Sequence, residues 1–153
     1  MNVRKATPKD EDRVLALLRQ LLIPGGEVHE DWNDEPGTIR RILKDPDLGS
    51  ILVAEEEGEI AGLTTLSFPF AIRCKGRYAC IEENIVDAKY RGKGVGSTLL
   101  KAAIAEAAAQ GCDELQVNNP SEMGYPLYIR HDLKENGKSL RIKLSSQSGA
   151  SSS

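Results

Sequence analysis

The chain has 153 residues, of which 40% are hydrophobic and 28% charged, so it can form one domain around a single core. Its formal net charge of −3 lacks the basic excess that nucleic-acid-binding proteins carry. No apolar run approaches the roughly 20 residues that span a bilayer. We therefore expect neither nucleic acid nor a membrane among its partners.

The cysteines indicate a reducing compartment. Cys74, Cys80 and Cys112 are odd in number and unrelated in spacing, which is typical of reduced thiols rather than of a disulfide framework. They form no CxxC pair, and the chain has two histidines. We therefore expect a cytoplasmic protein without a metal site.

The first elements are read from local signals. Residues 2–6 alternate weakly, as a short strand does. Thr7 and Pro8 then favour a helix start, because Thr caps well and Pro suits the first helical position. A helix is expected from there to the glycines near residue 25, and a second helix over residues 37–44.

The remaining elements complete a mixed α/β (α+β) pattern. Strands are expected at residues 50–55, 59–68, 77–86, 114–118 and 139–144, and helices at residues 97–110 and 122–132. This order predicts a single mixed, mostly antiparallel sheet of six to seven strands flanked by about four helices, parallel only across the long helix. Residues 1–144 would form the domain, and the Ser-rich residues 145–153 a disordered tail.

The strongest chemical signal is the run Tyr90-Arg91-Gly92-Lys93-Gly94-Val95-Gly96-Ser97, between a strand and the long helix. Small residues let a ligand approach the backbone, and the first amides of a helix have no internal partners. With two cations beside them, these amides form an anion site suited to a diphosphate. Neither a Walker A loop nor a dinucleotide fingerprint fits the spacing. The alternative to an anion site is that this run is only a tight structural turn.

Residues 81–100 as a whole resemble the acetyl-CoA motif of the GNAT superfamily of N-acetyltransferases. Within this run, Arg91, Gly94 and Gly96 match the family pattern of Arg or Gln, two residues, Gly, one residue, and Gly or Ala. The expected order of elements also fits the family outside the Ser-rich tail. The resemblance implies a GNAT-like fold and transfer of acetyl from acetyl-CoA to a primary amine in a ternary complex. Homodimers are frequent in the family, but nothing in these residues selects one.

The resemblance also implies residue roles. The amides of residues 91–97 would hold the diphosphate, and Ile85, Val86 and Asp87 would run beside the pantetheine arm. The amide of Val86 or a neighbour would polarise the thioester carbonyl. Asn118 or Asn119 would bond the pantetheine amides, unless these residues only form a turn.

Acyl transfer to an amine needs a base, because an alkyl ammonium has a pKa near 10.4. Glu82 aligns with a glutamate of related glucosamine-6-phosphate acetyltransferases and is our first candidate, with Glu83 second. Strand alternation would put them on opposite faces. Alternatively, both are surface residues paired with Arg73 or Arg77.

A tyrosine is expected to protonate the departing thiolate. Tyr128 matches the family's tyrosine on the last helix, although Asp132-Leu133 replaces the Gly-Phe pair that usually follows it. Tyr125 is the reserve candidate. Tyr128 could instead be a core residue with a satisfied hydroxyl.

The acceptor site would be walled by the segment between the first two helices. Residues 27–35 carry five carboxylates, Glu30 and Asp31 among them, together with Trp32 and no Lys or Arg. Such a wall attracts a cation through charge and cation–π terms. We therefore expect a small cationic amine, such as a polyamine or aminoglycoside, as acceptor. The alternatives are a solvated acidic loop, a protein or peptide acceptor, and a catalytically silent acetyl-CoA-binding module.

Overall fold

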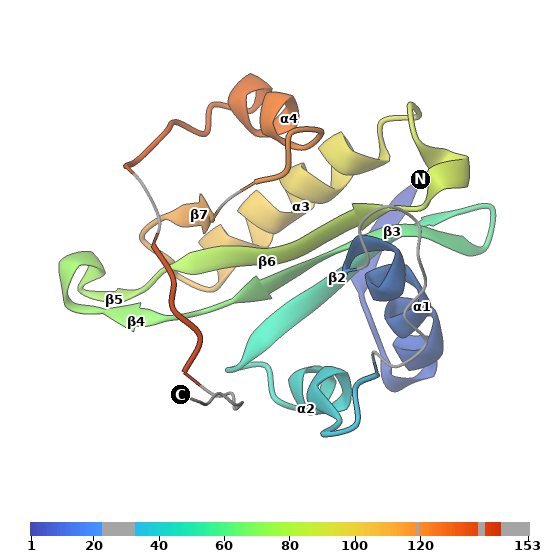
Figure 1. The fold of residues 1–153 in the computed structure, drawn as a ribbon, viewed down its shortest axis with the longest axis horizontal. Helices are drawn as coiled ribbons and strands as arrows, with labels where there is room; N and C mark the ends of the chain where they lie inside the picture. The colour runs from blue at the N-terminus through green and yellow to red at the C-terminus, as the bar shows by residue number, and fades with distance from the viewer. Residues whose placement is uncertain (23–32, 119, 138–139, 145–153) are drawn as a thin grey trace, which may run out of the picture.

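The computed structural model describes residues 1–22, 33–118, 120–137 and 140–144. Its main sheet has five strands in the order β1 (Asn2–Lys5), β2 (Gly49–Glu56), β3 (Glu59–Ser67), β6 (Ala79–Val86) and β7 (Leu115–Val117) (Figure 1). Neighbouring strands are antiparallel except β6 and β7, which are parallel. The parallel pair is joined through α3 (Val95–Ala109), as a crossover connection requires. The predicted mixed α/β fold is confirmed.

Helices cover both faces of this sheet (Figure 1). On one face, α1 (Glu11–Leu22) and α2 (Thr38–Lys44) pack on a core that includes Val53, Leu63 and Ile85. On the other face, α3 and α4 (Tyr125–Arg130) pack on a core that includes Leu66 and Ile81. We call these the α1 face and the α3 face.

Gly62 of β3 explains how closely α3 approaches the sheet. A Cβ at this position would lie 2.7 Å from the carbonyl oxygen of Ile85 and 3.2 Å from side-chain atoms of Val95 and Leu99. Only a residue without a side chain fits there. This glycine therefore allows the first turns of α3 to lie close against strand β3.

The expected strand over residues 77–86 is broken in the structure. Gly76–Arg77 forms β5, which pairs with β4 (Phe70–Ala71) in a separate two-stranded sheet. The intervening 3-10 helix η3 covers Ile72–Cys74. Tyr78 leaves the ladder because its amide donates to the carbonyl of Pro69 at 3.0 Å. The seven strands thus divide between two sheets.

The expected strand over residues 139–144 is wrong for its described part. Residues 140–144 have no regular secondary structure, and Leu140, Ile142 and Leu144 are 95%, 81% and 90% exposed. Alternation alone is insufficient, because a strand needs a partner for its backbone groups. The tail at residues 145–153 lies outside the described residues.

The helix limits also differ from those expected. α3 begins at Val95 rather than Ser97, so Gly96 and Ser97 lie in its first turn. α4 ends with a bond from the Leu133 amide to the Tyr128 carbonyl at 3.0 Å, and Asp132 takes the left-handed conformation at φ 68°. This is the backbone that helices usually complete with glycine. Asp132 therefore takes the backbone conformation that a glycine would adopt at this helix end.

In the part of the chain that the structure describes, no helix combines the length and the apolar character needed to cross a bilayer.

Candidate active site

The first turn of α3 presents amides without a side-chain cap. Its N-cap residue is Gly94, at φ 83°, and among the described residues no side chain caps the first amides of the helix. The amides of Val95, Gly96 and Ser97 have no intrahelical acceptor, because a helix leaves its first donors unpaired. They form an anion site in front of the helix.

α2 begins with the same kind of glycine but is capped by the protein itself. Its N-cap Gly37 has φ 74°, and the Asp34 carboxylate accepts from the amides of Thr38 at 2.9 Å and Ile39 at 2.7 Å. The chain thus provides its own anion for α2. Among the residues that the structure describes, no such group caps α3, which is the arrangement expected for an external anion.

Residues 91–94, which we call the glycine loop, lead into this anion site. All four are exposed, and Gly92 has φ 78°. Lys93 lies with its ammonium 5.5 Å from the centre of the Tyr90 ring. Arg91 forms no ion pair with any residue that the structure describes. The loop therefore places two positively charged side chains, those of Arg91 and Lys93, next to the start of α3.

Strand β6 has an open edge next to the glycine loop. It pairs with β7 only from Ala79 to Ile81, and its later residues have β3 as their one strand neighbour (Figure 1). Ile85 is buried in the core of the α1 face, and Val86 packs near the start of α3. Unpaired strand backbone is a template for an extended ligand. The expectation of a pantetheine arm along Ile85 and Val86 fits this edge.

Glu82 and Glu83 lie on the same face of the sheet, contrary to the alternation expected. Thr65 pairs with Glu83 and Leu66 with Ile81, so Glu82 is an extra residue, a β-bulge. The Ser67 hydroxyl donates to Glu82 Oε2 at 2.6 Å.

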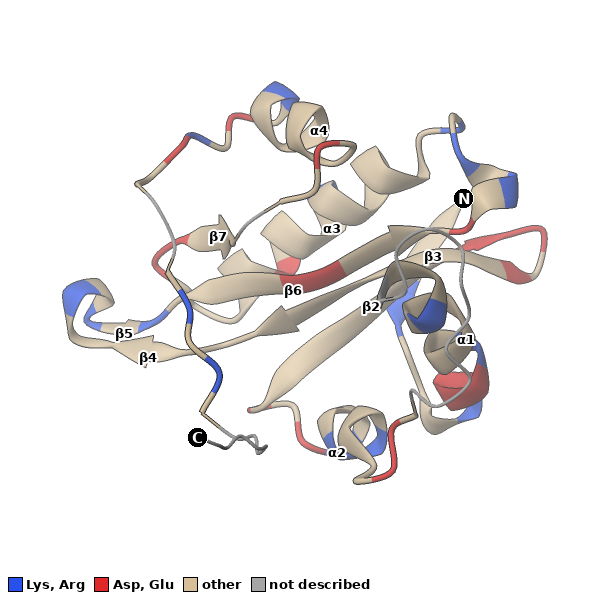
Figure 2. Cartoon of the chain, in the orientation of Figure 1, with Lys and Arg blue, Asp and Glu red and all other residues tan. Residues whose placement is uncertain are grey.

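The alternate β3 residues identify this face. Thr65, whose hydroxyl accepts from the Glu83 amide at 3.0 Å, and Ser67 share a strand face with Leu63, which belongs to the core under α1. Both carboxylates are therefore on the α1 face. Figure 2 shows them as the acidic segment of β6.

The two carboxylates differ in environment. Burial raises the pKa of Glu83 above its ordinary value, the Thr65 hydroxyl opposes the rise, and the neighbouring Glu82 charge adds to it. Glu82 is the more exposed of the two. A carboxylate with a raised pKa is the better proton acceptor, so the environment favours Glu83 over Glu82 as base.

Cys80 lies beside these carboxylates. Burial, reinforced by Glu82, raises the pKa of its thiol to about 12. The thiol is therefore protonated at neutral pH and is a poor nucleophile. Asn118, at the end of β7, donates to its sulfur at 3.6 Å.

The alternative interpretation of Glu82 and Glu83 was that they form ion pairs with Arg73 or Arg77. In the described residues Arg73 instead binds Glu114, and Arg77 binds Asp47.

Tyr128 is held by a residue that the sequence analysis missed. Its side chain is buried, and its hydroxyl accepts from Asn84 Nδ2 at 3.2 Å. The hydroxyl proton is not used in this bond. Burial raises the pKa of Tyr128, with Asn84 opposing the rise, so the phenol stays protonated at neutral pH. The sequence signal for Asn84 was that it follows Glu82 and Glu83 as a third polar residue in a strand that is otherwise apolar.

Other candidates are placed elsewhere. The Tyr125 hydroxyl donates to Glu135. His131 bonds the Ser97 hydroxyl at 2.8 Å, between α4 and the first turn of α3. The Asp87 carboxylate accepts a hydrogen bond from Arg13 at 2.6 Å. The expected acceptor residues Glu30, Asp31 and Trp32, and Asn119, lie outside the described residues. Within the described residues, no group of three or more His, Cys, Asp or Glu side chains could hold a metal ion.

Solved structures share this fold. A predicted acetyltransferase from Clostridium acetobutylicum, solved with acetyl-CoA, matches with a TM-score of 0.78 and 24% identity, covering 93% of this chain and 95% of its own. Glucosamine-6-phosphate N-acetyltransferase from Arabidopsis thaliana matches with a TM-score of 0.76 and 22% identity, covering 94% and 98%.

Sequence comparison identifies the family. An aminoalkylphosphonate N-acetyltransferase of Salmonella typhimurium is 30% identical over 135 residues, which are 87% of this chain and 84% of that protein. Glucosamine 6-phosphate N-acetyltransferase 1 of rice, Oryza sativa, is 31% identical over 77 residues, 48% of this chain and 46% of its own. The model of the acetyltransferase (GNAT) family matches residues 15–128. The chain therefore belongs to the GNAT family of acetyltransferases.

Proposed function

We propose that the chain transfers acetyl from acetyl-CoA to the primary amine of a small cationic molecule, by direct attack in a ternary complex. The observation that carries the proposal is the placement of Glu82 and Glu83 on one face, beside the open edge of β6. Two adjacent carboxylates favour an ammonium group through charge.

The residues of the site supply complementary chemistry. Acetyl-CoA provides an activated thioester, with its diphosphate at the anion site of α3. Glu83 removes the proton that the amine must lose before it attacks, and Glu82 holds the ammonium. The Tyr128 hydroxyl, whose own proton is free, protonates the departing sulfur. The protonated Cys80 thiol disfavours an acetylated cysteine and supports direct transfer.

A different acceptor class has one observation in its favour. Two relatives bear names that specify aminoalkylphosphonate and glucosamine 6-phosphate as acceptors, and both molecules combine an amine with an anionic group. An amine that carries a phosphonate or phosphate is therefore the second candidate. In either case the carboxylates of Glu82 and Glu83 would be the negative charges nearest the reacting nitrogen.

The acceptor class is tested by thiol release from acetyl-CoA with a panel of amines. Polyamines and aminoglycosides should be better acceptors than aminoalkylphosphonates and sugar phosphates, and the opposite preference would refute the cationic acceptor. Thiol release with peptides alone would indicate a protein acceptor. Intact acetyl-CoA binding without release on any amine would indicate a silent module.

The roles of the carboxylates are tested on the best acceptor of this panel. Glu83→Gln should lower kcat by about 100-fold, as removal of a general base does. In the wild type, kcat should fall with decreasing pH through the raised pKa of Glu83, because the protonated carboxyl cannot accept a proton. Glu82→Gln should instead raise KM for the amine. A larger kcat loss in Glu82→Gln would reverse the two assignments.

A further inference from the structure

The glycine loop has few contacts that fix its own position. Its residues are exposed, its two glycines have positive φ, and the Arg91 amide reaches the Ala88 carbonyl only at 3.4 Å. Glycine loses more backbone entropy than other residues when it is ordered. The position of the loop must therefore come from its flanks, which are α3 and the 3-10 helix η4 (Ala88–Tyr90).

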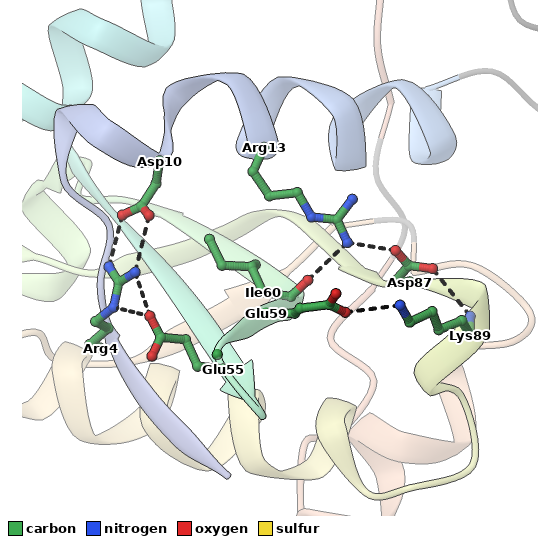
Figure 3. Close-up of a pocket in the computed structure, with 9 residues that line it drawn as sticks. Arg4, Asp10, Arg13, Glu55, Glu59, Ile60, Asp87 and Lys89 are labelled. Carbon is green, nitrogen blue, oxygen red and sulfur yellow. Dashed lines mark hydrogen bonds and ion pairs between the residues drawn. The ribbon is translucent and has the colours of Figure 1, made fainter.

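Asp87, the N-cap of η4, is held from three directions at the end of β6. Its backbone amide donates to the Ala61 carbonyl at 2.8 Å. Its Oδ1 accepts from the Lys89 amide at 3.1 Å, and its Oδ2 accepts from Arg13 Nη2 at 2.6 Å (Figure 3). The backbone amide and both carboxylate oxygens of Asp87 thus form hydrogen bonds.

Arg13 connects this corner to the opposite layer of the fold. It lies in α1, and its Nη2 also donates to the Ile60 carbonyl of β3 at 2.9 Å (Figure 3). The Asp87 side chain is 15% exposed, so its pair with Arg13 is only partly screened by solvent. Arg13 lowers the pKa of Asp87, which keeps the carboxylate charged at neutral pH.

A second tether holds the other end of η4. The Tyr90 ring is buried against Val95 and Leu99 of α3, and its hydroxyl donates to Glu59 Oε2 at 2.5 Å. Lys89 donates to the same oxygen at 2.9 Å. η4 is therefore fixed at both ends before the glycine loop begins.

We propose that Asp87, held by Arg13, is a positioning residue that preorganises the glycine loop for the diphosphate of acetyl-CoA. A loop that is already in its binding position loses less entropy when the ligand binds. The inference rests on the proposed function, because it assumes that acetyl-CoA occupies the anion site.

A matched control residue lies near Asp87. Asp87 and Asp10 both line a cleft of about 510 Å³ (Figure 3). Asp10, the last residue of the 3-10 helix η1 (Pro8–Asp10), accepts from Arg4 at 2.8 and 3.0 Å and from the amide of the N-cap residue Thr7 at 2.7 Å. It is thus another Asp that is paired with Arg and bonds a backbone amide of a 3-10 helix, but its helix does not lead into the glycine loop.

Asp87→Asn keeps an oxygen for the Lys89 amide and removes the charge that binds Arg13. The dissociation constant of acetyl-CoA, measured by calorimetry on the full chain, should rise about fivefold. Amide hydrogen exchange of residues 91–97 in the free protein should become faster. Arg13→Gln, which leaves Asp87 in place, should have the same effect, and the double variant should add little. Asp10→Asn should change neither measurement.

Two outcomes would overturn the positioning role. One is unchanged acetyl-CoA affinity in folded Asp87→Asn and Arg13→Gln proteins. The other is an equal loss of affinity in Asp10→Asn, which would assign the effect to general stability. Failure of the wild type to bind acetyl-CoA would instead refute the proposed function, so the two failures are distinguishable.

Discussion

The substitution Gly94→Glu should block the anion site with little effect on the stability of the fold. Gly94 has φ 83°, and no atom lies within 4 Å of a Cβ built there, so the substitution costs only backbone strain of about 1 kcal/mol. A carboxylate at a helix N-terminus recovers about 0.5 kcal/mol. The variant should therefore fold. In front of α3, the new carboxylate would occupy the position of the diphosphate.

The loss of binding can be estimated from the amides involved. Three donors, those of Val95, Gly96 and Ser97, lie in the uncapped first turn. Hydrogen bonds to charged groups contribute about 1.5 kcal/mol each at the lower end, so losing all three costs about 4.5 kcal/mol, or roughly 2,000-fold in the dissociation constant. Acetyl-CoA calorimetry measures this loss, and thermal unfolding checks that the variant is folded.

Two variants serve as controls for Gly94→Glu. Gly94→Gln imposes the same strain and size without the charge, and its loss of affinity should be markedly smaller. Gly37→Gln introduces a side chain at φ 74° on the N-cap of α2, which Asp34 already caps, and should leave acetyl-CoA affinity unchanged. A folded Gly94→Glu protein that binds acetyl-CoA within tenfold of the wild type would refute the assignment of the anion site.

Two further predictions concern Tyr128 and Asp10. Tyr128→Phe should lower kcat at least tenfold with little change in the acetyl-CoA dissociation constant, because it removes only the proton donor. An unchanged kcat would show that Tyr128 has a structural role only. Arg4 lowers the pKa of Asp10 from 3.8 to about 2, so this carboxylate stabilises the fold above pH 4 by about 2 kcal/mol and loses that contribution as pH falls to 2. In urea unfolding, Asp10→Asn should therefore be less stable than the wild type at pH 7 and nearly equal to it near pH 2, and a constant difference would contradict the linkage.

The sequence predicted features whose causes are local. The glycine loop and α3 follow from glycines that accept positive φ and from a run of strong helix formers, both within about 20 residues. The prediction placed the start of α3 two residues late, because Val95 and Gly96 read as loop residues although both are in the helix. Helix limits depend on the first hydrogen bonds, which residue type alone does not fix.

Features that depend on distant partners were not predicted. Arg13 and Asp87 are 74 residues apart, and the sequence around either residue does not indicate that the two form an ion pair. The alternation at residues 140–144 is typical of a strand, but no described strand pairs with it. The β6 bulge likewise depends on register with β3, so alternation within β6 placed Glu82 and Glu83 on opposite faces when they share one.

That bulge accounts for two properties of the site at once. The last pair between β6 and β7 is Ile81 with Val117, and the extra residue of the bulge is Glu82, the next along β6. A bulge bends its strand and increases the local twist, which turns β6 away from a short parallel neighbour. The open edge therefore begins where both carboxylates have been brought to the α1 face. A thioester along that edge and an amine on that face would meet at Glu83, so one inserted residue would bring the proposed base to the open edge of β6.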